Sequence, residues 1–253
     1  MPLLKVIRFR FRYVALAAAL ASLLYGSWAR VSEVLEQRYM ETLSTVLANR
    51  VIVVDPGHGG IDGGSESPGG TKEKDITLEV SKRLAVMLGQ AGAVVLLTRE
   101  SDMWLADPEA PHKKRSDLTK RVEMANRNSA DVFISIHVNS FTASRSQRGA
   151  QTFSQPGSEE GKLLSHFIQG ELARILGNTS RKPKEIDYFI RHSKVPAVIV
   201  EIGFISNPAE EKLLLDSAYQ SKMAFAIYCG LVKYIADKDT RQSGSKNQTK
   251  TFS

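Results

Sequence analysis

Short apolar runs alternate with amphipathic segments along most of the chain, and this alternation limits the possible folds more than any other feature. Apolar residues at helical spacing occupy the segments between the runs, for example residues 75–92 and 158–176. Strands that are almost continuously apolar and alternate with helices are typical of a sheet covered on both faces. The sequence therefore predicts an α/β domain. The apolar runs include VIVV from Val51, AVVLLT from Ala93, VFISIH from Val132 and AVIVE from Ala197.

The first apolar run ends in a glycine-rich loop, DPGHGGIDGG, which covers residues 55–64 and contains His58. Such a loop can cradle a phosphate or can leave room for the histidine to reach a metal. A Walker loop ends in Gly-Lys-Ser/Thr and a dinucleotide loop has the spacing G-x-G-x-x-G, and neither pattern is present here. The loop therefore does not support phosphate binding, but by itself it does not establish a metal site.

Three of the predicted strands end at residues that can carry chemistry, namely His58, His137 and Glu201. Ligands of open α/β sheets bind outside the carboxyl ends of the strands, so these side chains are expected at one edge. A single histidine at a strand end is usually structural, whereas the convergence of three such residues favours a site. Catalytic zinc accepts imidazole nitrogen and carboxylate oxygen and typically takes three protein ligands.

Two glutamates complete this candidate site, and each has a simpler alternative role. Glu73, at the start of the first helix after the loop, is a possible third metal ligand, or it complements the positive helix N-terminus. Glu201 follows four apolar residues, so poor solvation would raise its pKa and suit it to proton transfer. Its alternative is a helix cap or a salt bridge.

The N-terminal residues indicate export. The basic stretch KVIRFRFR precedes an uncharged run from Val14 to Ala29, which is short for a membrane span and ends near the small pair Ser27 and Ala29. We expect residues 1–29 to be a signal peptide or a membrane anchor formed by residues 13–29, rather than a buried helix of the domain. A helical stalk or linker is expected at 30–49, the folded domain at 50–236 and a disordered polar tail at 237–253.

Charge and cysteine content exclude two classes of site. The formal charge is +7, and four of the basic residues lie before Ala29. Because no basic stripe alternates with aromatic residues, we expect no nucleic-acid partner. Cys229 is the only cysteine, so neither an internal disulfide nor a cysteine-based zinc site can form.

Six motifs, in this order, resemble those of the zinc-dependent N-acetylmuramoyl-L-alanine amidases, the family-3 cell-wall amidases. The resemblance runs from about Arg50 to Ala236. It implies a single α/β domain with a mixed, mostly parallel sheet flanked by helices on both faces. It also implies Zn²⁺ held by His58, Glu73 and His137, with Glu201 as the catalytic residue. The motifs are VVDPGHGGIDGG, KEKDITLEVSKRL, VVLLTRESD, LTKRVEMAN, FISIHVNS and VEIGFISN.

The implied reaction is hydrolysis of the amide between N-acetylmuramic acid and L-alanine in peptidoglycan. Asn139, on the same side of its strand as His137, is expected to orient substrate or a ligand. Asp55 is expected either to hydrogen-bond a ligating imidazole or only to close the turn. Arg99 and Arg121 lie in family motifs and are expected to be structural.

The layout, one catalytic domain behind one export segment, is similar to that of the germination-specific amidases of endospore formers. That similarity implies action on spore cortex peptidoglycan, in the envelope or the forespore intermembrane space. A membrane-anchored or lipoprotein activator could dock on the 30–49 stalk or on the basic loop NTSRKPK, and the isolated protein is expected to be a monomer. The rival functions are a zinc peptidase or deacetylase acting on peptidoglycan, and a non-catalytic cell-wall-binding module.

Overall fold

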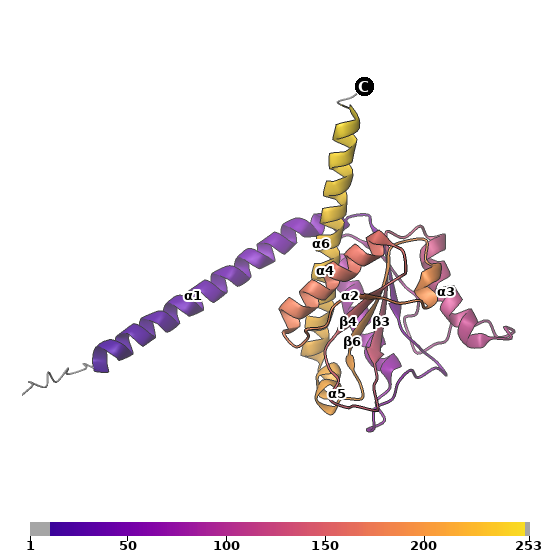
Figure 1. The fold of residues 1–253 in the computed structure, drawn as a ribbon, viewed down its shortest axis with the longest axis horizontal. Coiled ribbons are helices and arrows are strands. Elements are labelled where there is room, and N and C mark those ends of the chain that lie inside the picture. The colour runs from indigo at the N-terminus through magenta and orange to yellow at the C-terminus, as the bar shows by residue number, and fades with distance from the viewer. Residues whose placement is uncertain (1–10, 251–253) are drawn as a thin grey trace, which may run out of the picture. The chain divides into compact units, whose positions relative to one another are not determined.

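The computed structural model describes residues 11–250, which divide at residue 42 into two compact units that are treated separately (Figure 1). The described part of the first unit belongs to helix α1 (Phe11–Ser44), which includes both the second part of the predicted export segment and most of the predicted stalk. Residues 1–10, where that predicted segment begins, lie outside the described residues. No helix among the described residues is long and apolar enough to cross a membrane.

The second unit is an α/β domain built on a six-stranded sheet with the strand order β2-β1-β3-β6-β4-β5. β1, β2, β3 and β6 are parallel, β4 is antiparallel to β6, and β5 is parallel to β4. The sheet is therefore mixed and mostly parallel, as the resemblance implied. Its strands are β1 (Val51–Pro56), β2 (Val94–Leu97), β3 (Val132–Asn139), β4 (Gln151–Ser154), β5 (Lys184–Glu185) and β6 (Ala197–Phe204).

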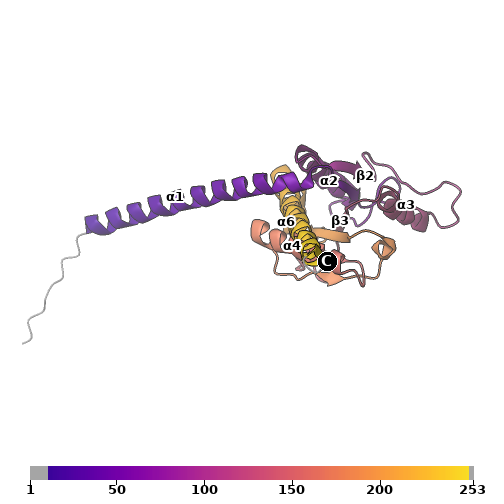
Figure 2. The ribbon, with the colours of Figure 1, turned by 90° about the horizontal axis from the view of Figure 1, so that it is seen from above.

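Helices cover both faces of the sheet (Figures 1 and 2). One layer consists of α2 (Glu73–Gln90), α4 (Glu159–Leu176) and α6 (Ser217–Lys250), with α6 packed against both others. The opposite layer contains α3 (Lys113–Arg127) and the 3₁₀ turn η2 (Phe189–His192), which contact each other. Because side chains alternate across a strand, each apolar run supplies both layers.

The core under α3 and η2 illustrates this alternation. Val53 of β1, Phe133 of β3 and Ile199 of β6 pack in one cluster with Val122 of α3 and Ile190 of η2. The residues next to them in each strand are also buried and point to the other face. Burial on both faces fixes the register of the three central strands and so fixes where each strand ends.

The C-terminal region differs from the predicted one. The helical segment expected at residues 208–236 is two helices, α5 (Pro208–Leu215) and α6, and α6 continues to Lys250 instead of giving way to a disordered tail at 237. Ion pairs connect the start of this extension to the domain, since Arg241 binds Glu160 and Asp239 binds Arg50. These are contacts between distant segments rather than apolar burial. Residues 251–253 lie outside the described part.

The basic loop is partly held on the domain. Its last residue, Lys184, forms β5 with Glu185, and Arg181 lies 4.5 Å from the centroid of the Phe204 ring. The Arg181 guanidinium also donates to the backbone oxygen of Arg148. This arginine is therefore used to hold the loop on the domain.

Candidate active site

The glycine loop after β1 brings His58 toward the end of β3. His58 has a φ of 63°, a left-handed conformation that is uncommon outside glycine. A Cβ on Gly57 would lie 2.5 Å from the His137 ring, so glycine at this position lets that ring pack directly against the loop. The two histidine rings are 4.9 Å apart between centroids and meet edge to face at 79°.

Glu73, the first residue of α2, lies between these two histidines. Its Oε1 is 3.2 Å from His58 Nε2 and 3.1 Å from His137 Nδ1. The backbone N–H of Val138 donates to the same oxygen at 2.8 Å, and that of Ser65 donates to Oε2 at 2.8 Å. Burial acts to raise the pKa of Glu73, but the hydrogen bonds with His137 and His58 outweigh it and hold the pKa well below its usual range.

One ligand atom each from His58, Glu73 and His137 lies within 4.8 Å of the others, so the group can hold a metal ion. The three side chains come from the β1 loop, the start of α2 and the end of β3. They border an open cavity of about 410 Å³. The structure therefore brings together the three residues that the sequence proposed as ligands.

Glu201 lines the same cavity from β6. It is paired in register with His137, so the two side chains leave neighbouring strands at the same level of the sheet. Its Oε2 is buried and has no hydrogen-bond partner. Burial raises the pKa of Glu201 to about 7. The described residues therefore hold a carboxylate that is free to take or give a proton.

Asp62 is a member of the site that sequence reasoning missed. Its Oδ2 lies 3.0 Å from His58 Nδ1, on the side of the ring opposite Glu73, and its Oδ1 accepts from the N–H of Gly64. The loop turns back between Gly59 and Asp62 through an isolated bridge, which brings the carboxylate over the ring. The two groups are close enough for an ion pair but lack hydrogen-bond geometry, since His58 Nδ1 has no hydrogen-bond partner among the described residues. A carboxylate at this nitrogen is the usual device for orienting an imidazole that binds a metal through its other nitrogen. The only sequence signal is an acid four residues after His58 in a glycine-rich turn.

Asp55 does not contact either site histidine through a hydrogen bond, contrary to one of its two predicted roles. It is fully buried, and it accepts from Thr98 Oγ1 at 2.5 Å, Ser135 Oγ at 2.6 Å and Arg121 Nη1 at 2.7 Å. These three donors hold the carboxylate beneath the loop, with hydrogen bonds to both of its oxygens. Asp55 therefore supports the turn instead of orienting a ligand.

Two buried arginines hold the backbone of the loop, in line with their predicted structural role. Arg121 donates to the carbonyl oxygens of Pro56 and His58, each at 2.7 Å. Arg99 donates to the carbonyl oxygens of Pro56 at 3.0 Å and of Lys74 at 2.8 Å. Because Lys74 follows Glu73, Arg99 ties the loop that carries one histidine to the helix that carries the glutamate.

Asn139 lines the cavity, as its spacing from His137 predicts. Its Oδ1 accepts from the N–H of Ser140 at 2.8 Å, and the pairing of β3 with β6 shifts register between His137 and Asn139. Asn139 still pairs with β6, opposite Phe204, and is the last residue of β3.

Two histidines and a carboxylate around one point, with a second buried carboxylate on the neighbouring strand, form the arrangement of a metal-dependent hydrolase. Comparison with known proteins specifies the class further. The model of the N-acetylmuramoyl-L-alanine amidase family matches residues 52–233, and the chain belongs to this family of enzymes. This confirms the family inferred from the six motifs.

Individual relatives agree with this assignment. The germination-specific N-acetylmuramoyl-L-alanine amidase of Bacillus subtilis is 42% identical over 201 residues, which cover 77% of this chain and 84% of that protein. The structure of the CwlD amidase from Clostridioides difficile in complex with the GerS lipoprotein matches with a TM-score of 0.71 and 39% identity, covering 74% of this chain and 99% of that chain. The amidase AmiC2 of Nostoc punctiforme matches with a TM-score of 0.66 and 30% identity, covering 74% and 97%.

Proposed function

We propose that this enzyme uses zinc to hydrolyse the amide between the lactyl group of N-acetylmuramic acid and the L-alanine that begins the stem peptide. The observation that carries the proposal is the convergence of the three ligand atoms of His58, Glu73 and His137 in a cavity that Glu201 also lines. The rest of the argument assigns a task to each of these side chains.

The donor set fits zinc. Two imidazole nitrogens and one carboxylate oxygen are a known ligand set of catalytic zinc, which keeps a further position open. The ligand atoms border an open cavity, so substrate can reach them. When bound, zinc would act as a Lewis acid toward the scissile carbonyl and would make water acidic at neutral pH. Nε2 of His58 lies 3.2 Å from Glu73, and Asp62 lies 3.0 Å from Nδ1 on the other side of the ring.

Glu201 is the proposed proton carrier. A general base works best when its pKa lies near the working pH, and burial places that of Glu201 at about 7. Its unpartnered Oε2 can accept a proton from the attacking water. The same oxygen can then deliver that proton to the departing amine of L-alanine, which leaves as a neutral amine or, at lower pH, as an ammonium.

The cellular role follows from the relatives. One of them is named as germination-specific and another was solved with a lipoprotein. We infer that this chain acts outside the cytoplasmic membrane, on spore cortex peptidoglycan, and that removal of stem peptides there prepares the cortex for germination. We also infer that a lipoprotein partner binds it.

The test is digestion of purified peptidoglycan by the zinc-loaded protein, with the products identified by mass spectrometry. Intact stem peptides with a new L-alanine amine, together with peptide-free glycan, are the expected products. Shortened peptides would indicate a peptidase, and new glucosamine amines would indicate a deacetylase. Either result would overturn the proposal, as would binding to peptidoglycan without any cleavage.

A further inference from the structure

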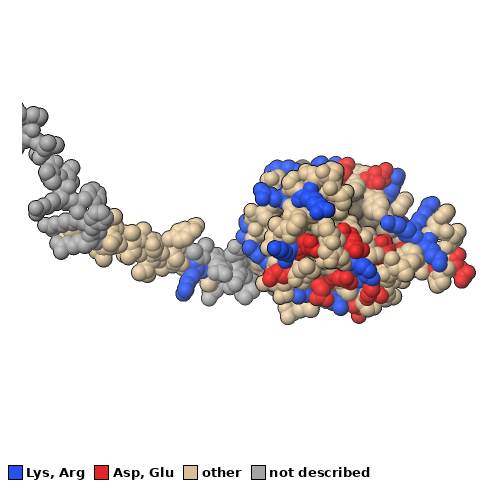
Figure 3. All heavy atoms as spheres, turned by 90° about the horizontal axis from the view of Figure 1, so that it is seen from below, with Lys and Arg blue, Asp and Glu red and all other residues tan. Residues whose placement is uncertain are grey.

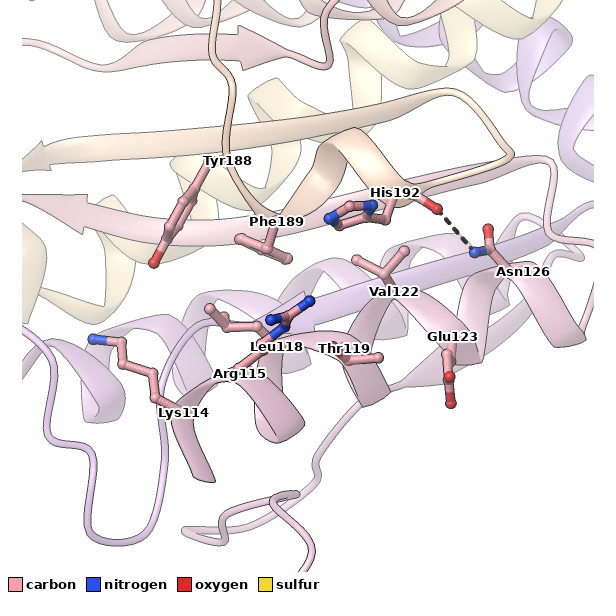
Figure 4. Close-up of a pocket in the computed structure, with 10 residues that line it drawn as sticks. All are labelled: Lys114, Arg115, Leu118, Thr119, Val122, Glu123, Asn126, Tyr188, Phe189 and His192. Carbon is pink, nitrogen blue, oxygen red and sulfur yellow. Dashed lines mark hydrogen bonds between the residues drawn. The ribbon is translucent and has the colours of Figure 1, made fainter. Parts of the chain in front are cut away.

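A second cavity, of about 630 Å³, lies between α3 and η2 (Figure 4). Leu118 and Val122 of α3 form one wall, and Phe189 of η2 forms the other. In Figure 4, Lys114 and Tyr188 lie at one end of the groove, and Asn126 and His192 at the other. We refer to this cavity as the α3 groove.

The α3 groove continues into the catalytic cavity. Lys114 lines both of them. Phe189 lies with its ring centroid 6.4 Å from that of His137 and 5.1 Å from that of Tyr188. A chain that leaves the metal-binding residues past Lys114 therefore enters the groove directly.

Two cations, Lys114 and Arg115, line the groove, and Lys114 also interacts electrostatically with Asp62 of the adjoining catalytic cavity. In Figure 4 the guanidinium of Arg115 points from α3 toward η2, whereas the carboxylate of Glu123 points away from the groove. Apart from the backbone hydrogen bonds of α3, the hydrogen bond within this set of ten residues joins Asn126 Nδ2 to the carbonyl oxygen of His192, so no lining carboxylate pairs with Lys114 or Arg115. Figure 3 shows both Lys or Arg and Asp or Glu side chains on the face of the domain that it draws.

We propose that the α3 groove binds the peptide portion of the substrate and that Arg115, with Lys114, receives a carboxylate of the residue that follows L-alanine. This inference rests on the proposed function, since it requires a muramoyl peptide at the catalytic cavity. The apolar walls accommodate aliphatic parts of the peptide, and the guanidinium supplies paired donors for a carboxylate.

The charge of the groove distinguishes the two halves of the substrate. Cleavage occurs between a glycan strand and a peptide, and only one of them can follow the groove. An N-acetylated glycan offers hydroxyl and amide groups but few negative charges, whereas a peptide with acidic residues offers carboxylates. Two cations beside apolar walls therefore favour the peptide over the glycan. The catalytic cavity is also lined by Ser65 and Ser140, which do not line the α3 groove, and the glycan is assigned to that part of the cavity.

The experiment uses the zinc-loaded full chain and two soluble muramoyl-L-alanyl peptides. They are identical except that the residue after L-alanine carries a carboxylate in one and a carboxamide in the other. We expect the Arg115→Ala variant to lose about tenfold in kcat/KM on the carboxylate peptide, the effect of one hydrogen bond to a charged group. The kcat/KM on the carboxamide peptide should change by less than about twofold, because that peptide makes no charge-assisted contact.

Lys120→Ala is the matched control. Lys120 lies on the same helix and is exposed; it lines a neighbouring surface cavity, which shares Arg115 with the α3 groove, but does not line the groove itself. The Lys120→Ala variant should keep the wild-type kcat/KM on the carboxylate peptide and on the carboxamide peptide. If the glycan fills the groove, Arg115→Ala should lose kcat/KM equally on both peptides, and this result would overturn the inference. An unchanged kcat/KM on both peptides would also overturn it. Both outcomes leave the proposed function intact, whereas a wild-type protein that cleaves neither peptide contradicts the proposed function itself.

Discussion

The surroundings of Glu73 and Glu201 differ sharply although both carboxylates line one cavity. Glu73 is surrounded by donors, with two backbone N–H groups and two imidazoles within 3.2 Å. Glu201 has a buried oxygen with no partner. The pKa of Glu73 is held low, and that of Glu201 is raised to about 7. A carboxylate fixed in its ionised form suits a metal, whereas one near neutrality suits proton transfer.

The largest effect should come from Glu73. We expect Glu73→Gln to release the metal and to reduce amidase activity to background, because the amide lacks the charge that the ligand position requires. Zinc content after gel filtration, measured by atomic absorption, checks the first part. A Glu73→Gln protein that keeps its zinc would contradict the assignment of metal binding to Glu73 and of proton transfer to Glu201.

Glu201→Gln should separate catalysis from metal binding. Amidase activity is expected to fall about 10²–10⁴-fold, the usual contribution of a general acid–base group, while zinc content stays at the wild-type value. The peptidoglycan digestion assay and the same zinc measurement check both halves. The role of Glu201 is refuted if turnover is undiminished.

Substitution of Asp62, which contacts the ligand His58, should have a smaller effect, and that effect should be on zinc affinity. Asp62→Asn should weaken zinc binding about 10–100-fold, because a carboxylate partner orients the ligating imidazole. Competition with a chromophoric chelator measures the affinity. Asp107→Asn, an exposed acid in the loop before α3, is the control and should bind zinc like the wild type. Unchanged affinity in Asp62→Asn would remove Asp62 from the site.

The smallest effect concerns stability in the metal-free protein. Below about pH 4.5 Glu201 is protonated in both the folded and the unfolded state and contributes no difference. As the pH rises to about 7, the unfolded state ionises first, so the raised pKa of Glu201 makes the folded protein progressively less stable. Glu201→Gln should therefore be more stable than the wild type by about 1–3 kcal/mol at pH 8, and equally stable at pH 4.

Chemical denaturation in EDTA at the two pH values measures this difference. Glu109→Gln, which replaces an exposed glutamate, should show no difference at either pH. If Glu201→Gln is no more stable than the wild type at pH 8, the carboxylate is better solvated than its surroundings indicate.

Much of this site could be predicted from the sequence, because buried strands and helices produce recognisable patterns of apolar residues. The apolar runs of β1, β3 and β6 define parallel strands, and parallel strands place His58, His137 and Glu201 at one edge. The choice between ligand and helix cap for Glu73 came from the family resemblance, since both roles place an acid at the same position.

Other features depend on contacts that no local pattern encodes. The approach of Asp62 to His58 requires the turn of the glycine loop, and Asp55 is occupied by donors from three distant segments. The first part of the α6 extension makes ion pairs with distant segments, such as that of Arg241 with Glu160. The α3 groove forms between helices that lie far apart in the chain. These contacts become visible only when the segments are placed in space.

Glu73 is assigned to metal binding and Glu201 to proton transfer. Anomalous scattering at the zinc absorption edge, from crystals of the zinc-loaded protein, tests this assignment most directly. We predict one peak within bonding distance of His58, Glu73 and His137, about 2.0–2.2 Å from each ligand atom, with the Glu201 carboxylate outside that distance. A peak that Glu201 ligates, or one from which Glu73 is absent, would contradict the account.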